Sequence, residues 1–285
     1  MIKIFKYIFQ AFFVYLFLLI SRVIGLNFSR ELFSFIFKKV GPIIRSDIII
    51  EKNLKIYKKN LLVKEINSIK SKMWSNYGMT FVEYIFLNKF KKEDNHISIV
   101  GSDILDEIIK KDKPVIFVSG HFANFELMSM ELTKKKVNLA TIYRPLNNFF
   151  LNFFMEYLRK KYVCTNQIKK GRSGVKKTIE YINKKYSVAL MIDQRVSEGE
   201  MIDFFNIKAL TSTLPAQLSK KFNLDIVPIF LERKYNNNFE MTINKPIEFS
   251  KSDNKLEVTK KLNNVLEDMI RKNPNQWIWT HNRWK

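Results

Sequence analysis

From about residue 97 onward, short apolar runs alternate with longer segments that carry polar residues at helical spacing. The apolar runs have the length of buried strands, and they fall at 97–100, 114–118, 138–143, 187–192 and 226–231. The segments between them predict helices near 102–111, 123–135, 148–161, 173–184, 213–222 and 255–272. A further strand or hairpin is predicted within 238–249. Strands that alternate with helices are typical of βαβ units, so the pattern predicts an α/β fold with a mostly parallel central sheet flanked by helices.

Residues 4–26 form a different kind of segment, because their apolar side chains surround the helix instead of forming one stripe. The charge-free part, Tyr7 to Ser21, would extend about 22 Å as a helix, against a hydrocarbon core of roughly 30 Å. Lys6 and Arg22 could reach the interface from either end, so a thin membrane span and a deeply embedded helix both fit. A buried core helix is the alternative. A cleaved signal peptide fits less well, because no small-residue cleavage site follows. We expect a membrane anchor.

The region between these two parts is helical by pattern. Residues 27–48 predict an amphipathic segment that stops at Gly41-Pro42, and residues 50–90 alternate lysine-rich and apolar positions at helical spacing. Four aromatic residues share one stripe there, which is typical of a core: Trp74, Tyr77, Phe81 and Tyr84. The expected organisation is an anchor helix over 1–26 and one domain over 27–285, with a helical part at 27–95 and an α/β core at 96–285.

Composition narrows the possible environments and partners. The 285 residues carry a formal net charge of +22, and arginine supplies only 10 of the 49 basic residues. Such an excess favours an anionic partner: a membrane surface, an acidic carrier protein or a nucleic acid. Nucleic acid is the weakest option, because the lysines are spread along the chain and no nucleic-acid motif accompanies them. Cys164 is the single cysteine, which excludes a disulfide framework and suits a reducing compartment.

The strongest chemical signal is the stretch Val118-Ser-Gly-His121-Phe-Ala-Asn-Phe-Glu126, which follows an apolar run. In α/β proteins the turn after a strand lies at the carboxyl edge of the sheet, where chemistry is usually placed. Five residues correspond to about 500° on a helix, so His121 should lie in the turn and Glu126 on the first turns of the next helix. A carboxylate near a histidine can fix its tautomer and stabilise its charged form, and we expect Glu126 to do so. A helix-capping loop with an incidental histidine is the alternative.

Other polar residues occupy turns that could join such a site. Arg144 and Asp193 each follow a predicted strand, Arg159 lies near the end of a helix, and Arg172 lies in a glycine-containing turn. Each also has a plain structural interpretation, such as a solvated turn or a helix-end charge. His281, in the tryptophan-rich final segment, is a candidate second histidine or a structural one. No metal-site spacing is present, and we expect neither a metal nor a cofactor.

The ordered set of motifs resembles one family over nearly the whole chain: the late acyltransferases of lipid A biosynthesis, the lauroyl/myristoyl transferases of Gram-negative bacteria. They belong to the wider glycerolipid acyltransferase group marked by His-x4-Asp/Glu. The resemblance rests on the N-terminal hydrophobic helix and on a series of short motifs: Gly41-Pro42 with Arg45, Asn53-Leu54, Met73-Trp74, Glu83-Tyr84, Gly120-His121 to Asn124 and Glu126, Tyr143-Arg144-Pro145, Asp193-Gln194, Gly199, Phe204-Phe205, Thr211, Pro228 and the tryptophan-rich end. Asn206 and Phe125 depart from it, where glycine and tryptophan are common.

The resemblance implies an acyl-carrier-protein thioester as donor and a Kdo-bearing lipid A precursor as acceptor, at the cytoplasmic face of the bacterial inner membrane. His121 would be the general base and Glu126 would orient it. The resemblance places Arg159 at the oxyanion or the acceptor phosphates and gives Asp193 an important role of uncertain nature. The expected substrate-binding or oxyanion set is Arg159, Asp193, Arg144, Asn124, Gln194 and Arg172. Two alternatives stay open: a glycerophospholipid or glycolipid acyltransferase with the same chemistry, and an inactive membrane-bound scaffold that binds lipid or carrier protein.

Overall fold

The fold is built on a seven-stranded sheet. The computed structural model describes residues 2–250 and 252–285. The strand order is β1-β9-β8-β2-β5-β3-β4, and every neighbouring pair is parallel except β8 and β9. The strands are β1 (Ile97–Val100), β2 (Ile116–Ser119), β3 (Leu139–Tyr143), β4 (Asn166–Lys169), β5 (Ser187–Met191), β8 (Ile226–Arg233) and β9 (Phe239–Ile243). The expected α/β fold with a mostly parallel central sheet is confirmed.

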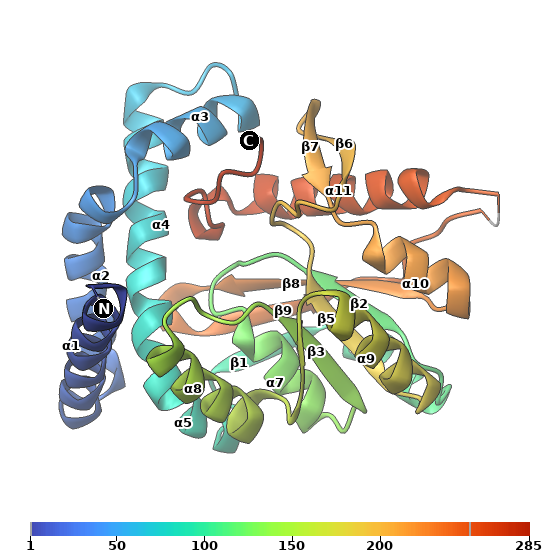
Figure 1. Ribbon diagram of the computed structural model, residues 1–285, viewed down its shortest axis with the longest axis horizontal. Helices are drawn as coiled ribbons and strands as arrows, with labels where there is room; N and C mark the ends of the chain where they lie inside the picture. The colour runs from blue at the N-terminus through green and yellow to red at the C-terminus, as the bar shows by residue number, and fades with distance from the viewer. Residues whose placement is uncertain (1, 251) are drawn as a thin grey trace.

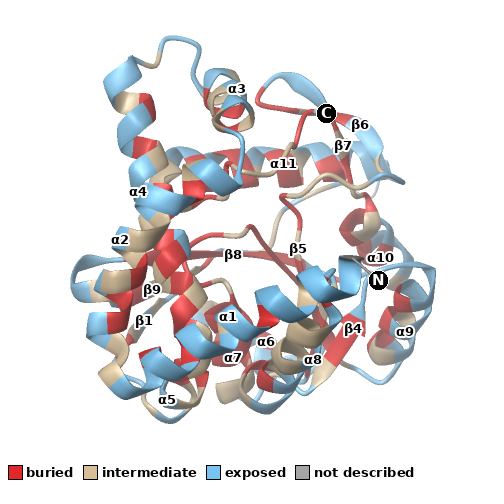
Figure 2. Ribbon diagram, turned by 60° about the vertical axis from the view of Figure 1, so that its left-hand side comes forward, coloured by how far each residue is buried: buried red, intermediate tan, exposed pale blue. Residues whose placement is uncertain are grey.

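Helices cover both faces of this sheet (Figure 1). They are α6 (Ser102–Lys110), α7 (Glu126–Lys134), α8 (Phe149–Leu158), α9 (Arg172–Asn183), α10 (Leu214–Phe222) and α11 (Lys255–Lys272). Every residue of the central strands β2 and β8 is buried, as Figure 2 shows for β8. Strands enclosed on both faces need apolar side chains on both faces, which is why they read as continuous apolar runs in the sequence.

Three strands have no counterpart in the sequence pattern. β4 lies at an edge of the sheet, and its sequence Asn-Gln-Ile-Lys carries only one apolar side chain. β6 (Glu200–Phe204) and β7 (Ile207–Thr211) form a separate antiparallel hairpin. Its two turn residues, Phe205 and Asn206, both have positive φ, at 51° and 58°. This backbone is that of a tight hairpin turn, but phenylalanine is not a residue that signals one.

The N-terminal part consists of helices packed beside the sheet. They are α1 (Ile2–Ile24), α2 (Leu26–Ile44), α3 (Asp47–Tyr57), α4 (Val63–Glu83), the 3-10 turn Tyr84–Phe86 and α5 (Leu87–Lys92). The expectation that Gly41-Pro42 stops the helix is wrong, because α2 continues through both residues to Ile44. Pro42 lies in the last turn, so its missing N–H removes one intrahelical hydrogen bond close to the end of the helix. Gly41 lies against Trp74, whose ring a Cβ atom at this position would meet at 2.3 Å.

Candidate active site

The turn between β2 and α7 forms the floor of the candidate site. Gly120 is required there, because an added Cβ would meet the ring of Phe122 at 2.7 Å. Ala123 has a φ of +44°, a strained backbone for a residue with a side chain. The helix expected from residue 123 therefore begins only at Glu126.

Helix α4 holds this turn in place through side chains near its C-terminal end. The hydroxyl of Thr80 donates to the carbonyl of Ala123 over 2.9 Å, and the amide of Asn124 donates to Glu83 over 3.0 Å. Glu83 is fully buried and also pairs with Arg30 at 2.6 Å and Arg233 at 2.5 Å. The strained turn is thus fixed by a charge network that joins α2, α4 and β8.

The ring of His121 pairs with Asp193. Its Nδ1 lies 2.8 Å from Oδ1 of Asp193, and its backbone N–H donates to Oδ2 over 2.9 Å. The indole N–H of Trp277 donates to the same Oδ2 over 2.9 Å. The pairing follows from the sheet, because β2 and β5 are neighbours with Ser119 opposite Met191, which puts the residues two positions further on side by side.

This pairing determines the proton positions on His121. An ionised carboxylate only accepts hydrogen bonds, so Nδ1 carries a proton, and in the neutral ring the lone pair is then on Nε2. Burial alone would raise the pKa of the Asp193 carboxyl, but the charge of His121 and the three donated bonds hold it below the usual value. The His121 side chain stays 19% exposed while that of Asp193 is fully buried. The ring of His121 is therefore held by a buried carboxylate and is itself partly exposed.

Glu126 has different partners from those expected. Its Oε1 accepts from Nε and Nη2 of Arg159 over 2.8 and 2.6 Å and from the hydroxyl of Tyr84 over 2.5 Å. Among the hydrogen bonds of the described residues, none joins Glu126 to His121. The expectation that Glu126 orients His121 is therefore corrected: Glu126 begins α7 and turns toward α4 and α8, whereas Asp193 reaches the ring from the neighbouring strand.

Arg159 lies in the π-helical turn Arg159–Val163 that continues α8. Burial alone would lower the pKa of its guanidinium, but the negative charge of Glu126 raises it above the usual value. Burial, followed by the same charge, raises the pKa of Tyr84 well above 10.0, so this phenol stays neutral and donates. In the described part of the chain no hydrogen bond occupies Nη1 of Arg159, which leaves one edge of the fork available to an anion.

The final segment of the chain closes the site from the far side. Asn53 on α3 donates to the backbone carbonyls of Trp279 and His281 over 2.9 and 2.8 Å. Nε2 of His281 accepts from the backbone N–H of Arg195 over 2.9 Å. Burial lowers the pKa of His281 to about 4, so its ring is neutral at pH 7 and acts as an acceptor. This favours the structural interpretation of His281.

The remaining expected site residues are scattered. Arg144 follows β3, is exposed, and lies near enough to His281 for its charge to lower the pKa of that ring. Asn124 is fully buried against Glu83, so it supports the turn and does not face a substrate. Gln194 is half-buried beside Asp193, and Arg172 is exposed at the start of α9. Neither makes a side-chain hydrogen bond within the described residues.

Sequence reasoning missed the contacts of Tyr84, Glu83 and Trp277. Tyr84 stood out only as the end of an aromatic stripe, and the stripe's other members do pack, as the Phe37–Tyr77 and Phe37–Phe81 ring contacts show. Trp277 stood out as part of a tryptophan-rich end, with nothing in the sequence to tie it to Asp193.

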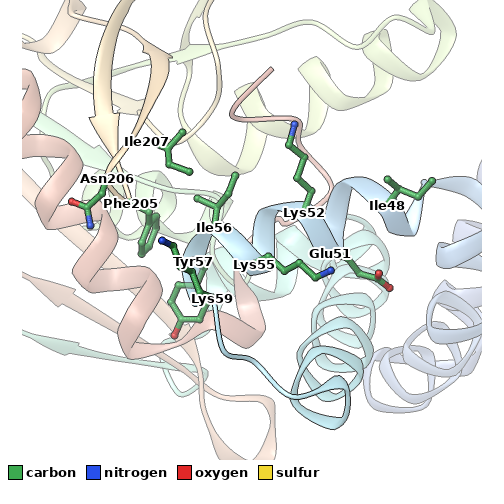
Figure 3. Close-up of a pocket in the computed structure, with 10 residues that line it drawn as sticks. All are labelled: Ile48, Glu51, Lys52, Lys55, Ile56, Tyr57, Lys59, Phe205, Asn206 and Ile207. Carbon is green, nitrogen blue, oxygen red and sulfur yellow. The ribbon is translucent and has the colours of Figure 1, made fainter.

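A separate groove of about 750 Å³ lies between α3 and the β6–β7 turn (Figure 3). It combines apolar walls, such as Ile56 and Phe205, with the amino groups of Lys52, Lys55 and Lys59. Its one acid, Glu51, already pairs with Lys70 at 3.0 Å. Among the described residues no ion pair neutralises these three lysines. We call this surface the α3 groove.

A mostly parallel sheet with helices on both faces, whose carboxyl edge holds a histidine paired with a buried aspartate, defines the protein as one of the α/β class. The chain belongs to the bacterial lipid A biosynthesis acyltransferase family, whose model matches residues 2–285. It is also similar to "Lipid A biosynthesis acyltransferase 2" of Shigella flexneri, with 23% identity over 186 residues. That match covers 63% of this chain and 58% of the relative. The family expected from the sequence motifs is confirmed.

Proposed function

We propose that the protein transfers a fatty acyl chain from an acyl-carrier-protein thioester to a hydroxyl of a Kdo-bearing lipid A precursor. The family match over residues 2–285 supports the reaction class. The single observation that carries the chemistry is the 2.8 Å contact between Nδ1 of His121 and Asp193. With a proton on Nδ1, the neutral ring has its lone pair on Nε2, which is the tautomer that a general base needs.

The proposed reaction has two covalent steps. His121 accepts a proton in the first step and returns it in the second. Nε2 of His121 removes the proton of the acceptor hydroxyl, and the oxygen attacks the thioester carbonyl carbon. The resulting oxyanion, or a phosphate of the acceptor, binds the free Nη1 edge of Arg159. The C–S bond then breaks, an ester remains on the acceptor, and the imidazolium returns its proton to the carrier thiolate. Asp193 stabilises the imidazolium throughout, as the acid of a triad does.

Glu126 has a positioning role in this scheme. It holds Nε and Nη2 of Arg159 through one carboxylate oxygen, while Tyr84 donates to that same oxygen. These bonds fix the orientation of the Arg159 guanidinium and leave the Nη1 edge available to a substrate anion.

The α3 groove supports an acyl-carrier-protein thioester as the acyl donor. Carrier proteins of this kind are acidic, and the groove offers three lysines without ion-pair partners among the described residues. An aromatic series leads from the groove to the site: Tyr57 contacts Trp279 at 5.4 Å, Trp279 contacts Trp277 at 4.6 Å, and Trp277 binds Asp193. A triple Lys→Glu variant at 52, 55 and 59 should raise KM for acyl carrier protein at least about tenfold, and much less for a short acyl thioester without the protein. The matched control is Lys→Glu at 92, 110 and 113, which lie at the end of α5, at the end of α6 and just after α6, outside the α3 groove.

The acceptor is tested by mass spectrometry. Lipid A from cells with the gene should carry one acyl chain more than lipid A from cells without it, and His121→Ala should not restore that chain. A purified protein that acylates glycerophospholipid or glycolipid and leaves the lipid A precursor unchanged would establish the main alternative. A protein that binds both substrates without turnover would establish the inactive scaffold.

The membrane attachment proposed with this function places the catalytic part at the cytoplasmic face of the inner membrane. The observation behind it is α1, whose residues Lys3–Ile24 form the one helix among those described that is long and apolar enough to cross a membrane. Exposed apolar side chains cover most of its circumference.

A further inference from the structure

Helix α1 contacts the rest of the protein along almost its whole length. Its less exposed positions are Tyr7, Ala11, Val14, Leu18 and Ser21, which recur at intervals of three and four residues. That spacing defines a single narrow face of a helix. The face is turned toward the protein, and the remaining circumference is exposed (Figure 2) and mostly apolar, with Gln10 as an exposed polar residue between Lys6 and Arg22.

Specific bonds hold both halves of α1 against the domain. The amide of Asn148, the N-cap of α8, donates to the carbonyl of Tyr7 over 2.9 Å. The hydroxyl of Tyr15 donates to the carbonyl of Phe150 over 2.8 Å, and its ring packs edge-on against Phe154 at 5.4 Å.

At the C-terminal end of α1, the contacts change from α8 to α5 and α2. Nη1 of Arg22 donates to the side chain of Asn88 over 3.3 Å. The hydroxyl of Ser29 donates to the carbonyl of Ser21 over 3.1 Å. Contacts therefore run from Tyr7 to Arg22, about 22 Å of helix.

This length leaves no free stretch of α1 that could cross a bilayer. A crossing needs about 20 apolar residues within roughly 30 Å of hydrocarbon. If α1 crossed, α8 would enter the hydrocarbon beside it, together with the side chains of Asn152 and Glu156. Glu156 pairs with Lys169 at 3.2 Å, so a crossing would take an ion pair to a depth where polar and charged side chains are strongly disfavoured. Lying flat in one leaflet avoids this cost.

Helix α8 presents a second apolar surface of the same kind. Phe149, Phe153 and Tyr157 are exposed at intervals of four residues, and Phe153 is 81% exposed. Lys160 and Lys161 follow at the end of the stripe, as Lys3 and Lys6 do at the start of α1. Aromatic and aliphatic residues flanked by lysines are typical of a helix in the interface of an anionic membrane.

We infer that α1 does not cross the membrane, and that α1 and α8 together form one surface that lies in the plane of the cytoplasmic leaflet of an anionic bilayer. This inference rests on the membrane attachment proposed above and is independent of the acyl-transfer chemistry. It also has a consequence for the site: α8 runs directly into Arg159, so the embedded surface ends at the arginine that would meet an anion at the headgroup level.

The first test locates the start of α1 relative to the membrane. Lys3→Cys is introduced into the full chain, whose own Cys164 is buried. A membrane-impermeant maleimide is applied to right-side-out spheroplasts and to inverted inner-membrane vesicles. We expect labelling only in inverted vesicles, the same sidedness as the control Lys110→Cys on the domain surface. Labelling of Lys3→Cys only in spheroplasts, with Lys110→Cys labelled only in inverted vesicles, would overturn the inference.

The second test asks whether α8 is in lipid. An environment-sensitive fluorophore on Phe153→Cys is measured with vesicles containing roughly one third anionic lipid, with and without nitroxide-labelled lipids. We expect a blue-shifted emission that the nitroxides quench several-fold more than the same fluorophore on Val175→Cys, an exposed position of α9. Water-like emission at position 153 with bound protein would contradict the in-plane surface, whatever the enzyme's activity.

Discussion

Replacing Asp193 by asparagine tests the central feature of the site, because the exchange removes a charge and almost no volume. Asp193 accepts bonds from the backbone N–H and Nδ1 of His121 and from the indole of Trp277. Asparagine offers one oxygen and one NH₂ group in place of two oxygens. The oxygen must face the two donors that share Oδ2, which are the His121 backbone and Trp277. The NH₂ group then faces Nδ1.

This arrangement exchanges the roles of the two ring nitrogens of His121. Nδ1 has to accept a bond, so the ring proton moves to Nε2 and the base can no longer take a proton from the acceptor. In the serine-protease triad the same exchange lowers kcat about 10⁴-fold. We expect a loss of roughly 10³ to 10⁴ in kcat, which corresponds to about 4 to 5.5 kcal/mol of lost transition-state stabilisation. The KM for the thioester should change little.

The assay is steady-state acyl transfer by purified variants, with thermal unfolding to confirm folding. The matched control is Asp203→Asn, which removes only an ion pair with Lys208 at the surface. Glu126→Gln is the informative comparison. If Asp193→Asn folds and loses less than about 30-fold while Glu126→Gln loses 10³ or more, the assignment of the orienting acid to Asp193 is refuted.

Three further predictions use other contacts. Arg159→Lys should keep the melting temperature within a few degrees but lose about tenfold or more in acyl transfer, because an ammonium has no planar fork; wild-type kinetics would make the residue structural. The ring of His281 has a pKa of about 4 in the folded protein and about 6.5 in the unfolded chain, so the unfolded chain binds more protons between these pH values. The urea midpoint of the wild type should therefore drop as the pH falls from 6.5 to 4. In His281→Gln this drop should be smaller. Glu83→Gln should cost roughly 3 to 5 kcal/mol in urea unfolding, since it leaves Arg30 and Arg233 buried without a counter-charge; an unchanged midpoint would contradict this.

The sequence predicted what depends on local pattern. β2 and β8 were readable because strands buried on both faces must be apolar throughout, and His121 was placed correctly in the turn after β2. β4 was not readable, since an edge strand with one apolar side chain has no hydrophobic period to detect. The partner of His121 was also beyond reach: Asp193 meets it only because β5 lies beside β2, and strand order is set by the packing of the whole sheet. Helical spacing correctly predicted that His121 and Glu126 do not share a helix face. It gave no indication that Asp193 is the acid that contacts His121.

The site is closed by segments that lie far apart in the sequence, which determines when its parts come together during synthesis. Asn53 binds carbonyls that follow it by 226 and 228 residues, and Trp277 is 84 residues beyond the Asp193 it supports. Because synthesis runs from the N-terminus, α1 and the helical part are made long before residue 277. During that time Asp193 lacks its indole donor and the tail that covers it. The surroundings of His121 and Asp193 are thus completed only after the segment that contains Trp277 has been made.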